Sequence, residues 1–285
     1  MNIKQKILAL GALLLGVGFL GASPAFAAEG YITAINLGGT GVMCEPRVGG
    51  TLWPVNGTTG ANSKFYYCGT STAASRGFSV YNPLKGISNV EPTIGTLMTT
   101  NTVRVYVFDS PLQYAQASGQ NPVTVWNAQI NKPAFSLFTA LGNPENAIIV
   151  YENVPDTAAG YPAVKPQSTT LQNHDSRHET GHHFDRYNGM LSNSATFNNL
   201  YPDDQAWEAA NNPQTVADNA AFAYWWGNKE ELFAEQFAIA TGSTARSPLD
   251  ADTTNYFKCT YRFTNNWYMN QANPAAGTYA TQCTP

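Results

Sequence analysis

Charged residues are scarce in this chain of 285 residues, because Asp, Glu, Lys and Arg together make up only 12% of it. The formal net charge is −4, and it becomes −6 without residues 1–27, which hold two lysines and no acid. A chain with this acidic balance is not expected to have nucleic acid or an anionic membrane surface as its main partner. Uncharged polar side chains must therefore solvate most of its surface, a composition that is common in exported proteins.

Cysteine is also rare: the chain has four, namely Cys44, Cys68, Cys259 and Cys283. An even number in an exported chain is typical of two disulfides. Three pairings are possible, and we favour Cys44–Cys68 and Cys259–Cys283, because these close the shortest loops. The spacing matches neither a zinc ribbon nor a redox CxxC pair, so a bound metal should not be held by sulfur.

Long apolar runs are missing from the chain after its first residues. Residues 7–20 form one such run, preceded by Lys4 and Lys6 and followed by the small residues of Ala25-Phe26-Ala27. This arrangement is typical of a signal peptide, with cleavage after residue 27. The run is too short to span a membrane as a helix. We therefore expect a secreted or periplasmic protein without a membrane anchor once the signal is removed.

Histidine is as rare as cysteine, and all four copies lie within ten positions: His174, His178, His182 and His183. His178 and His182 enclose Glu179-Thr180-Gly181, and on a helix their i, i+4 spacing places both rings on one face. Two neutral imidazoles at this spacing can hold two corners of a zinc ion. Glu179 points toward the same metal and can accept a proton from a water molecule on it.

The sequence predicts an α+β fold, with strands first and helices later. Residues 28–100, rich in Gly, Thr, Asn and Pro, are expected to form a β-type N-terminal region of short strands and turns, and residues 101–285 the catalytic region. Strands are expected at 102–108 and 147–152, with a short helix from Pro111. The second strand is our candidate for an exposed edge that pairs with an extended substrate.

Two later helices carry the chemistry. The motif helix is expected at about 171–187 after a cap at Thr170, although Ser176 and Glu179 could instead form a capping box that diverts Glu179 to the backbone. A second helix is expected at about 229–241, with Asn228 as its N-cap.

A catalytic zinc site needs a third protein ligand. A metzincin-type extension would require Gly at 185 and His at 188, but the chain has Asp185 and Asn188. The alternative is Glu231 as the ligand, with Glu235 behind it accepting a hydrogen bond from the far nitrogen of a ligand histidine. These acids could otherwise be a solvated face at a helix N-terminus, where the helix dipole favours negative charge.

Residues 178–185 (HETGHHFD), Tyr224, Asn228 and residues 231–237 (ELFAEQF) resemble the gluzincin metalloproteases of the anthrax lethal factor and Pro-Pro endopeptidase type. The resemblance covers about residues 171–242. It implies a zincin-like fold with a small sheet and the active-site helix in an N-terminal lobe, followed by a helical C-terminal lobe. It also implies one Zn²⁺ per chain and the hydrolysis of peptides or proteins.

The resemblance further implies that Tyr224 donates a hydrogen bond to the oxyanion of the reaction, although this residue could simply belong to an apolar core. Asp185 could support the site from behind or cap the helix locally. His183 and His174 are expected to make surface or structural contacts, with His174, four residues before His178, as the better candidate for a role in the site. Two rival functions remain: an exported binding protein without catalysis, and a zinc hydrolase of non-peptide substrates. The sequence carries no signal for the oligomeric state.

Overall fold

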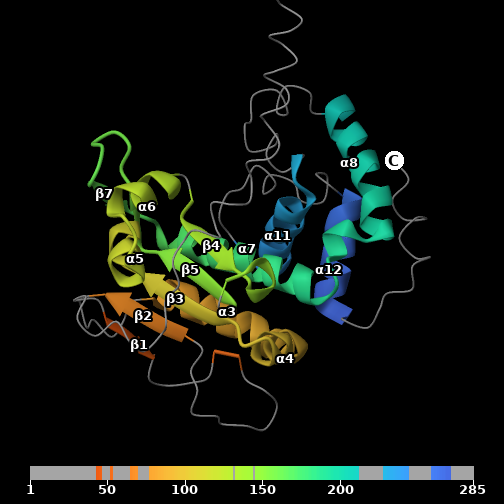
Figure 1. The fold of residues 1–285 in the computed structure, drawn as a ribbon. Helices are drawn as coiled ribbons and strands as arrows, with labels where there is room; N and C mark the ends of the chain where they lie inside the picture. Colours follow the sequence, from red (N-terminus) through yellow and green to blue (C-terminus); the bar gives the residue numbers. More distant parts are fainter. Residues whose placement is uncertain are drawn as a thin grey trace, which may run out of the picture.

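The computed structural model describes residues 43–46, 52–53, 65–69, 77–130, 132–143, 145–211, 227–243 and 258–270. Within these residues the protein is α+β, with one mixed sheet, a small hairpin and helices on both sides of the sheet (Figure 1). The predicted signal peptide, Tyr224 and Cys283 lie outside the described residues.

The main sheet has the strand order β1-β2-β3-β5-β4. Its strands are β1 (Met43–Pro46), β2 (Phe65–Gly69), β3 (Arg104–Phe108), β4 (Ala134–Leu137) and β5 (Ala147–Tyr151). The central strands β2, β3 and β5 run parallel, whereas β1 and β4 are antiparallel to their neighbours. Strands β6 (Asn153–Pro155) and β7 (Val164–Pro166) form a separate antiparallel pair.

The predicted disulfide between Cys44 and Cys68 is present, and it joins directly opposite residues of β1 and β2. Cys259 is disulfide-bonded as well. Its predicted partner Cys283 lies outside the described residues, so this second pairing stays a prediction.

The expectation that residues 147–152 form an edge strand is wrong. Strand β5 lies between β3 and β4, and all five of its residues are buried. A continuous apolar run is the pattern of a central strand that is covered on both faces, whereas alternation is typical of a half-exposed strand. Among the described strands, β4 is the edge strand on this side of the sheet.

Alternate residues of the strands face opposite layers of helices. Val105, Val107, Ile148 and Val150 belong to the core shared with α3 (Phe78–Val90) and α7 (Thr169–Tyr187). Their neighbours along the strands pack instead against α5 (Pro111–Ser118) and α6 (Pro122–Ala128): Tyr106, Phe108, Ile149 and Tyr151. The sheet is therefore the middle layer, and α7 crosses one of its faces.

Residues 78–100 are helical, although the sequence predicted strands and turns for this region. Val80, Leu84 and Ile87 are buried at helical spacing in α3, and α4 (Pro92–Thr100) follows with a proline in its first turn. Strand β2 precedes the expected domain boundary at residue 100 and pairs with β3 beyond it, so the sheet extends across that boundary.

Helix α7 begins at Thr169, because the hydroxyl of Ser168 accepts a hydrogen bond from Leu171 N at 3.2 Å. Ser176 lies well inside the helix and donates to Asn173 O at 2.8 Å. The alternative of a capping box between Ser176 and Glu179 is thereby excluded. Glu179 remains available for contacts with other side chains.

The described elements after α7 are all helical: the short 3₁₀ turn η2 (Leu191–Asn193), α8 (Ala195–Asn211), α11 (Lys229–Ala240) and α12 (Lys258–Asn270). As predicted, Asn228 caps α11, and its side chain accepts from Glu230 N at 3.1 Å and from Glu231 N at 3.4 Å. Figure 1 shows α8, α11 and α12 together on the side of the molecule away from β1. None of the described helices combines the length and apolar character needed to span a lipid bilayer.

Candidate metal centre

Gly181 allows α7 and α11 to approach closely. A Cβ atom at this position would lie 2.8 Å from Ala234 Cα and 3.0 Å from both Ala234 O and Phe237 Cβ. Beside this contact, the rings of Phe184 and Phe237 pack with their centroids 5.1 Å apart. The crossing brings the face of α7 that carries His174, His178 and His182 against the acidic residues of α11.

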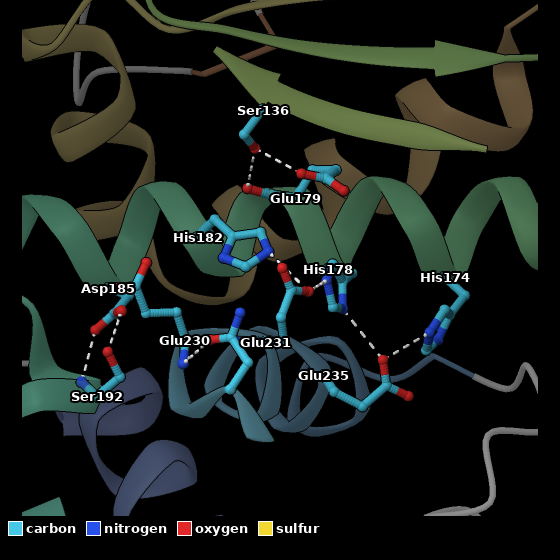
Figure 2. A network of polar contacts seen from close by, with 11 residues as sticks. Ser136, His174, His178, Glu179, His182, Asp185, Ser192, Glu230, Glu231 and Glu235 are labelled. Carbon is cyan, nitrogen blue, oxygen red and sulfur yellow. Dashed lines mark hydrogen bonds and ion pairs between the residues drawn. The ribbon is translucent and has the colours of Figure 1, made fainter. Parts of the chain in front are cut away.

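Three predicted ligands meet at this crossing. Glu231 Oε2 lies 3.1 Å from His178 Nε2 and 3.4 Å from His182 Nε2 (Figure 2). Bonds of about 2.1 Å in a tetrahedron around zinc place neighbouring ligand atoms about 3.4 Å apart, so this spacing suits a metal ion. The two imidazole side chains are 14% exposed and the glutamate side chain 20%, which leaves the group open to solvent water.

Glu179 lies on the side of α7 that faces the sheet, where its carboxylate accepts a hydrogen bond from Ser136 Oγ at 2.7 Å (Figure 2). Ser136 belongs to β4, so the edge strand holds the predicted proton acceptor beside the histidines. Ser136 was not among the predicted site residues. Its only local signal is that Phe135 and Leu137 are buried on the opposite face of the strand, which leaves Ser136 facing α7.

Glu235 lies behind His178, one of the predicted ligands. Its Oε2 atom lies 3.1 Å from His178 Nδ1, and the side chain is only 2% exposed. The same oxygen lies 3.0 Å from His174 Nε2, whose other ring nitrogen is 2.9 Å from Ser243 Oγ. His174 is therefore part of the cluster at the crossing, although the sequence favours a surface or structural role for it.

The described residues contain two groups that could hold a metal ion. One is His178, His182 and Glu231, and the other is His174, His178 and Glu235; in each group the ligand atoms lie within 4.8 Å of one another. The two groups share His178 through different ring nitrogens, Nε2 in the first and Nδ1 in the second. The first group is the more open to solvent, and the second is nearly sealed by its buried carboxylate.

Electrostatics at the crossing favour positive charge. Burial by itself would lower the pKa of His178, but hydrogen bonds to Glu231 and Glu235 raise that pKa well above its ordinary value. Burial likewise opposes the raised pKa of His182, which results from the charge of Glu231. In return the imidazoles hold the pKa of Glu231 below its ordinary value, although burial alone would raise it. Positive charge on the imidazoles offsets the negative charge of the carboxylates, and a divalent metal can supply positive charge at the same place.

Asp185 makes local contacts. Its carboxylate accepts from Ser192 N at 2.8 Å and from Ser192 Oγ at 2.6 Å, which closes the turn after α7. No hydrogen bond in the described part of the chain joins Asp185 to a histidine of the site. Of the two roles left open for Asp185, these contacts favour local capping.

His183 is structural, as expected. It is fully buried, with Nε2 at 3.1 Å from Ala147 O and Nδ1 at 3.2 Å from the hydroxyl of Tyr187. Burial lowers the pKa of His183 to about 3, so the ring is neutral at physiological pH. Because a carbonyl only accepts, Nε2 carries the proton and Nδ1 accepts from Tyr187. The histidine therefore ties α7 to β5.

No protein-family model matches the chain, and no curated protein matches it. The geometry of the α7–α11 crossing, together with the resemblance of its motifs, therefore carries the functional argument.

Proposed function

We propose that this protein is an exported zinc-dependent endopeptidase with a zincin-like fold of the gluzincin type. The observation that carries the proposal is the position of Glu231 Oε2, 3.1 Å from His178 Nε2 and 3.4 Å from His182 Nε2. This carboxylate comes from a helix some fifty residues further along the chain. Its return to the two imidazoles completes the three-ligand set that catalytic zinc sites of this class use.

The donor set fits zinc, because it consists of two imidazole nitrogens and one carboxylate oxygen at suitable spacing, with access for water. When bound, zinc supplies Lewis acidity, which polarises the peptide carbonyl and makes a water molecule more acidic. Glu179 accepts the proton of the attacking water and passes it to the leaving amine. Ser136 keeps the Glu179 carboxylate in place, and Glu235 orients the His178 ring. A role for Tyr224 in stabilising the oxyanion rests on the resemblance alone.

The edge of the sheet supports a peptide as the substrate. Strand β4 pairs with β5 on one side, is the last strand of the described sheet on the other, and lies beside Glu179 through Ser136. An extended peptide can add to such an edge by main-chain hydrogen bonds, which hold it irrespective of sequence while pockets select its side chains. This places the proposed substrate strand on β4 rather than on β5, which is internal.

The central test is Glu179→Gln in the secreted protein. We expect the variant to retain one zinc per chain by elemental analysis and to lose at least about 1,000-fold of the activity on a peptide library, because the proton acceptor is gone. Chelator should abolish wild-type cleavage. Glu230→Gln is a matched control, since Glu230 is a neighbouring acid of α11 outside both metal groups, and it should cleave normally. Wild-type protein that binds no zinc, or a verified Glu179→Gln preparation that still cleaves, would overturn the proposal.

The group of His174, His178 and Glu235 favours one alternative function, an exported binding protein whose metal is structural. Glu235 is 2% exposed, and closed, buried sites are typical of structural zinc. One zinc per chain with no cleavage of any peptide would support this alternative. Hydrolysis of esters or other non-peptide compounds by zinc-loaded protein, without peptide cleavage, would instead indicate a zinc hydrolase of another substrate class.

A further inference from the structure

Helix α7 presents a third imidazole one turn before His178, and no step of the proposed mechanism uses it. The centroids of the His174 and His178 rings are 6.4 Å apart, and those of His178 and His182 are 4.9 Å apart. The three rings thus follow one another along the face of α7 that meets α11 (Figure 2). His174 contacts both Glu235, the acid of α11 that lies behind His178, and Ser243, which lies three residues after the end of α11.

The directions of the hydrogen bonds connect His174 to the metal ligand. The carboxylate of Glu235 only accepts, so His178 donates to it from Nδ1 at 3.1 Å and His174 donates from Nε2 at 3.0 Å. A proton on His178 Nδ1 leaves the lone pair on Nε2, the atom that faces Glu231 and His182. In a neutral His174 ring, Nδ1 then accepts from the hydroxyl of Ser243 at 2.9 Å.

Ser243 is itself held by the end of α11. Helix α11 ends at Ala240, Gly242 follows with a φ of +93°, and Ser243 N donates back to Ala238 O at 3.0 Å. The hydroxyl that orients His174 is therefore attached to the same helix that carries Glu231 and Glu235. Both ends of the polar chain are fixed to one rigid element.

The other oxygen of Glu235 shows why His174 matters. Glu235 Oε1 is buried and has no hydrogen-bond partner among the described residues, so Oε2 makes all the polar contacts of this carboxylate there. Of its two partners, His178 is the ring to be oriented, which leaves His174 as the group that holds the carboxylate against it. Without His174, the carboxylate can rotate to satisfy either oxygen, and His178 Nδ1 loses an acceptor at a fixed position.

We propose that His174, held by Ser243, is a positioning residue of the metal centre: through Glu235 it keeps His178 in the tautomer whose Nε2 binds the ion. The inference rests on the proposed function in taking His178, His182 and Glu231 as the ligands. Carboxylates that contact metal-binding histidines typically change metal affinity by about 10- to 100-fold when they are replaced, and His174 acts one contact further out.

The experiment measures zinc affinity by competition with a chromophoric chelator, and so it needs no activity. We expect His174→Leu, which removes the donor at similar volume, to weaken zinc binding by about 10-fold. His174→Gln keeps an N–H group that can reach Glu235 and should recover most of this loss. Ser243→Ala should lose less than His174→Leu. Leu171→Ala, an exposed residue on the first turn of α7, is the control and should bind zinc as the wild type does.

A second readout reports the tautomer directly. Long-range ¹H–¹⁵N spectra of the zinc-loaded protein should show His178 protonated at Nδ1 in the wild type and in His174→Gln, with a broadened or mixed signal in His174→Leu. Unfolding with urea in the presence of chelator shows whether His174→Leu is folded. If it is not, His174→Gln and Ser243→Ala still test the inference through their affinities and spectra.

Three outcomes are decisive. Wild-type protein without zinc would remove the proposed function, and the inference with it. Zinc bound equally tightly by the wild type and by folded His174→Leu would overturn the positioning role alone. Finally, a His182→Ala protein that still holds one zinc, and loses it only when His174 is replaced as well, would place the ion on His174, His178 and Glu235 and make His174 a ligand instead.

Discussion

Two adjacent histidines of α7 meet opposite surroundings. His182 faces α11, and the charge of Glu231 raises its pKa against the effect of burial. His183 faces the sheet, and burial among apolar neighbours lowers its pKa to about 3 while Ala147 O accepts from its ring. One residue along a helix corresponds to a turn of about 100°, which is enough to separate an acidic interface from a dry core. The protonation behaviour of a histidine in this cluster therefore depends on the layer that its ring faces and not on its neighbours in sequence.

The largest expected effect comes from removing each histidine in turn. His182→Ala deletes one of three proposed ligands, and because structural zinc supplies about 10–16 kcal/mol in total, we expect zinc affinity to fall by on the order of 1,000-fold. His183→Ala should instead keep zinc affinity within about 3-fold and reduce the free energy of unfolding by about 2–4 kcal/mol, through a cavity and two lost hydrogen bonds. Chelator competition and urea unfolding measure the two quantities.

This pair of variants tests the contrast in both directions. If His182→Ala lost stability without losing zinc, or if His183→Ala lost zinc while folded, the two faces of α7 would not have separate roles. Unfolding should be compared in the presence of chelator, so that loss of the metal does not register as loss of the fold.

The second largest effect is expected at Gly181, where α7 and α11 cross. In Gly181→Ala the new methyl group meets the backbone of Ala234, which cannot move as a flexible side chain can. We expect a net loss of about 1–3 kcal/mol in unfolding free energy and a roughly 10-fold weaker zinc affinity, because α11 and Glu231 shift away from the rings. Gly86→Ala in α3 is the matched control: nothing lies within 4 Å of its added Cβ, so higher helix propensity should stabilise it by up to about 1 kcal/mol. A stabilised Gly181→Ala with normal zinc affinity would contradict the close-packing argument.

Much of the crossing could be predicted from the sequence, because its signals are local. Asn228 before an acidic first turn marks the start of α11, and the spacing of His178 and His182 specifies one face of a helix. The return of Glu231 to that face was inferred from the resemblance and from the need for a third ligand, and the structure brings these side chains together.

The contacts that were missed join residues distant in sequence. Ser136 and Glu179 are 43 positions apart, and His174 and Ser243 are 69 apart, so no periodicity within either segment reports them. The internal position of β5 was missed for a related reason. Strand order depends on which neighbours pair, and β4, which covers β5, was not predicted as a strand. Helices α3 and α4 were not predicted, because the Gly, Pro and Thr in residues 78–100 are typical of turns.

A smaller effect is expected on the side of α7 that faces β4. Ser136→Ala removes the hydroxyl that donates to Glu179 at 2.7 Å. A hydrogen bond to a charged group contributes about 1.5–3 kcal/mol, part of which water restores at this half-buried position, so we expect kcat to fall by about 10-fold. Zinc affinity should not change, because Ser136 contacts no proposed ligand. Ser136→Thr, which keeps the hydroxyl, should recover activity, and equal activity of all three proteins would show that β4 does not position Glu179.

The smallest expected effect is the pH dependence that His183, on the side of α7 facing the core, gives to the free energy of unfolding. The pKa of His183 is depressed to about 3 in the folded protein from about 6.5 when it is unfolded, so the unfolded chain gains a proton below about pH 6.5 and the folded chain does not. The stability contributed by the neutral ring is fully present above that pH and declines as pH falls toward 3. Between pH 7.0 and 5.5 the loss of stability amounts to about 1 kcal/mol.

Urea unfolding at both pH values should show that the wild type loses about this much more stability than His183→Gln, which can still donate to Ala147 O but does not titrate. Measured under identical zinc conditions, the titration of the histidines facing α11 is common to both proteins and cancels in the difference. An equal loss in the two proteins would mean that His183 is solvated in the folded state, and the contrast between the adjacent histidines would then fail.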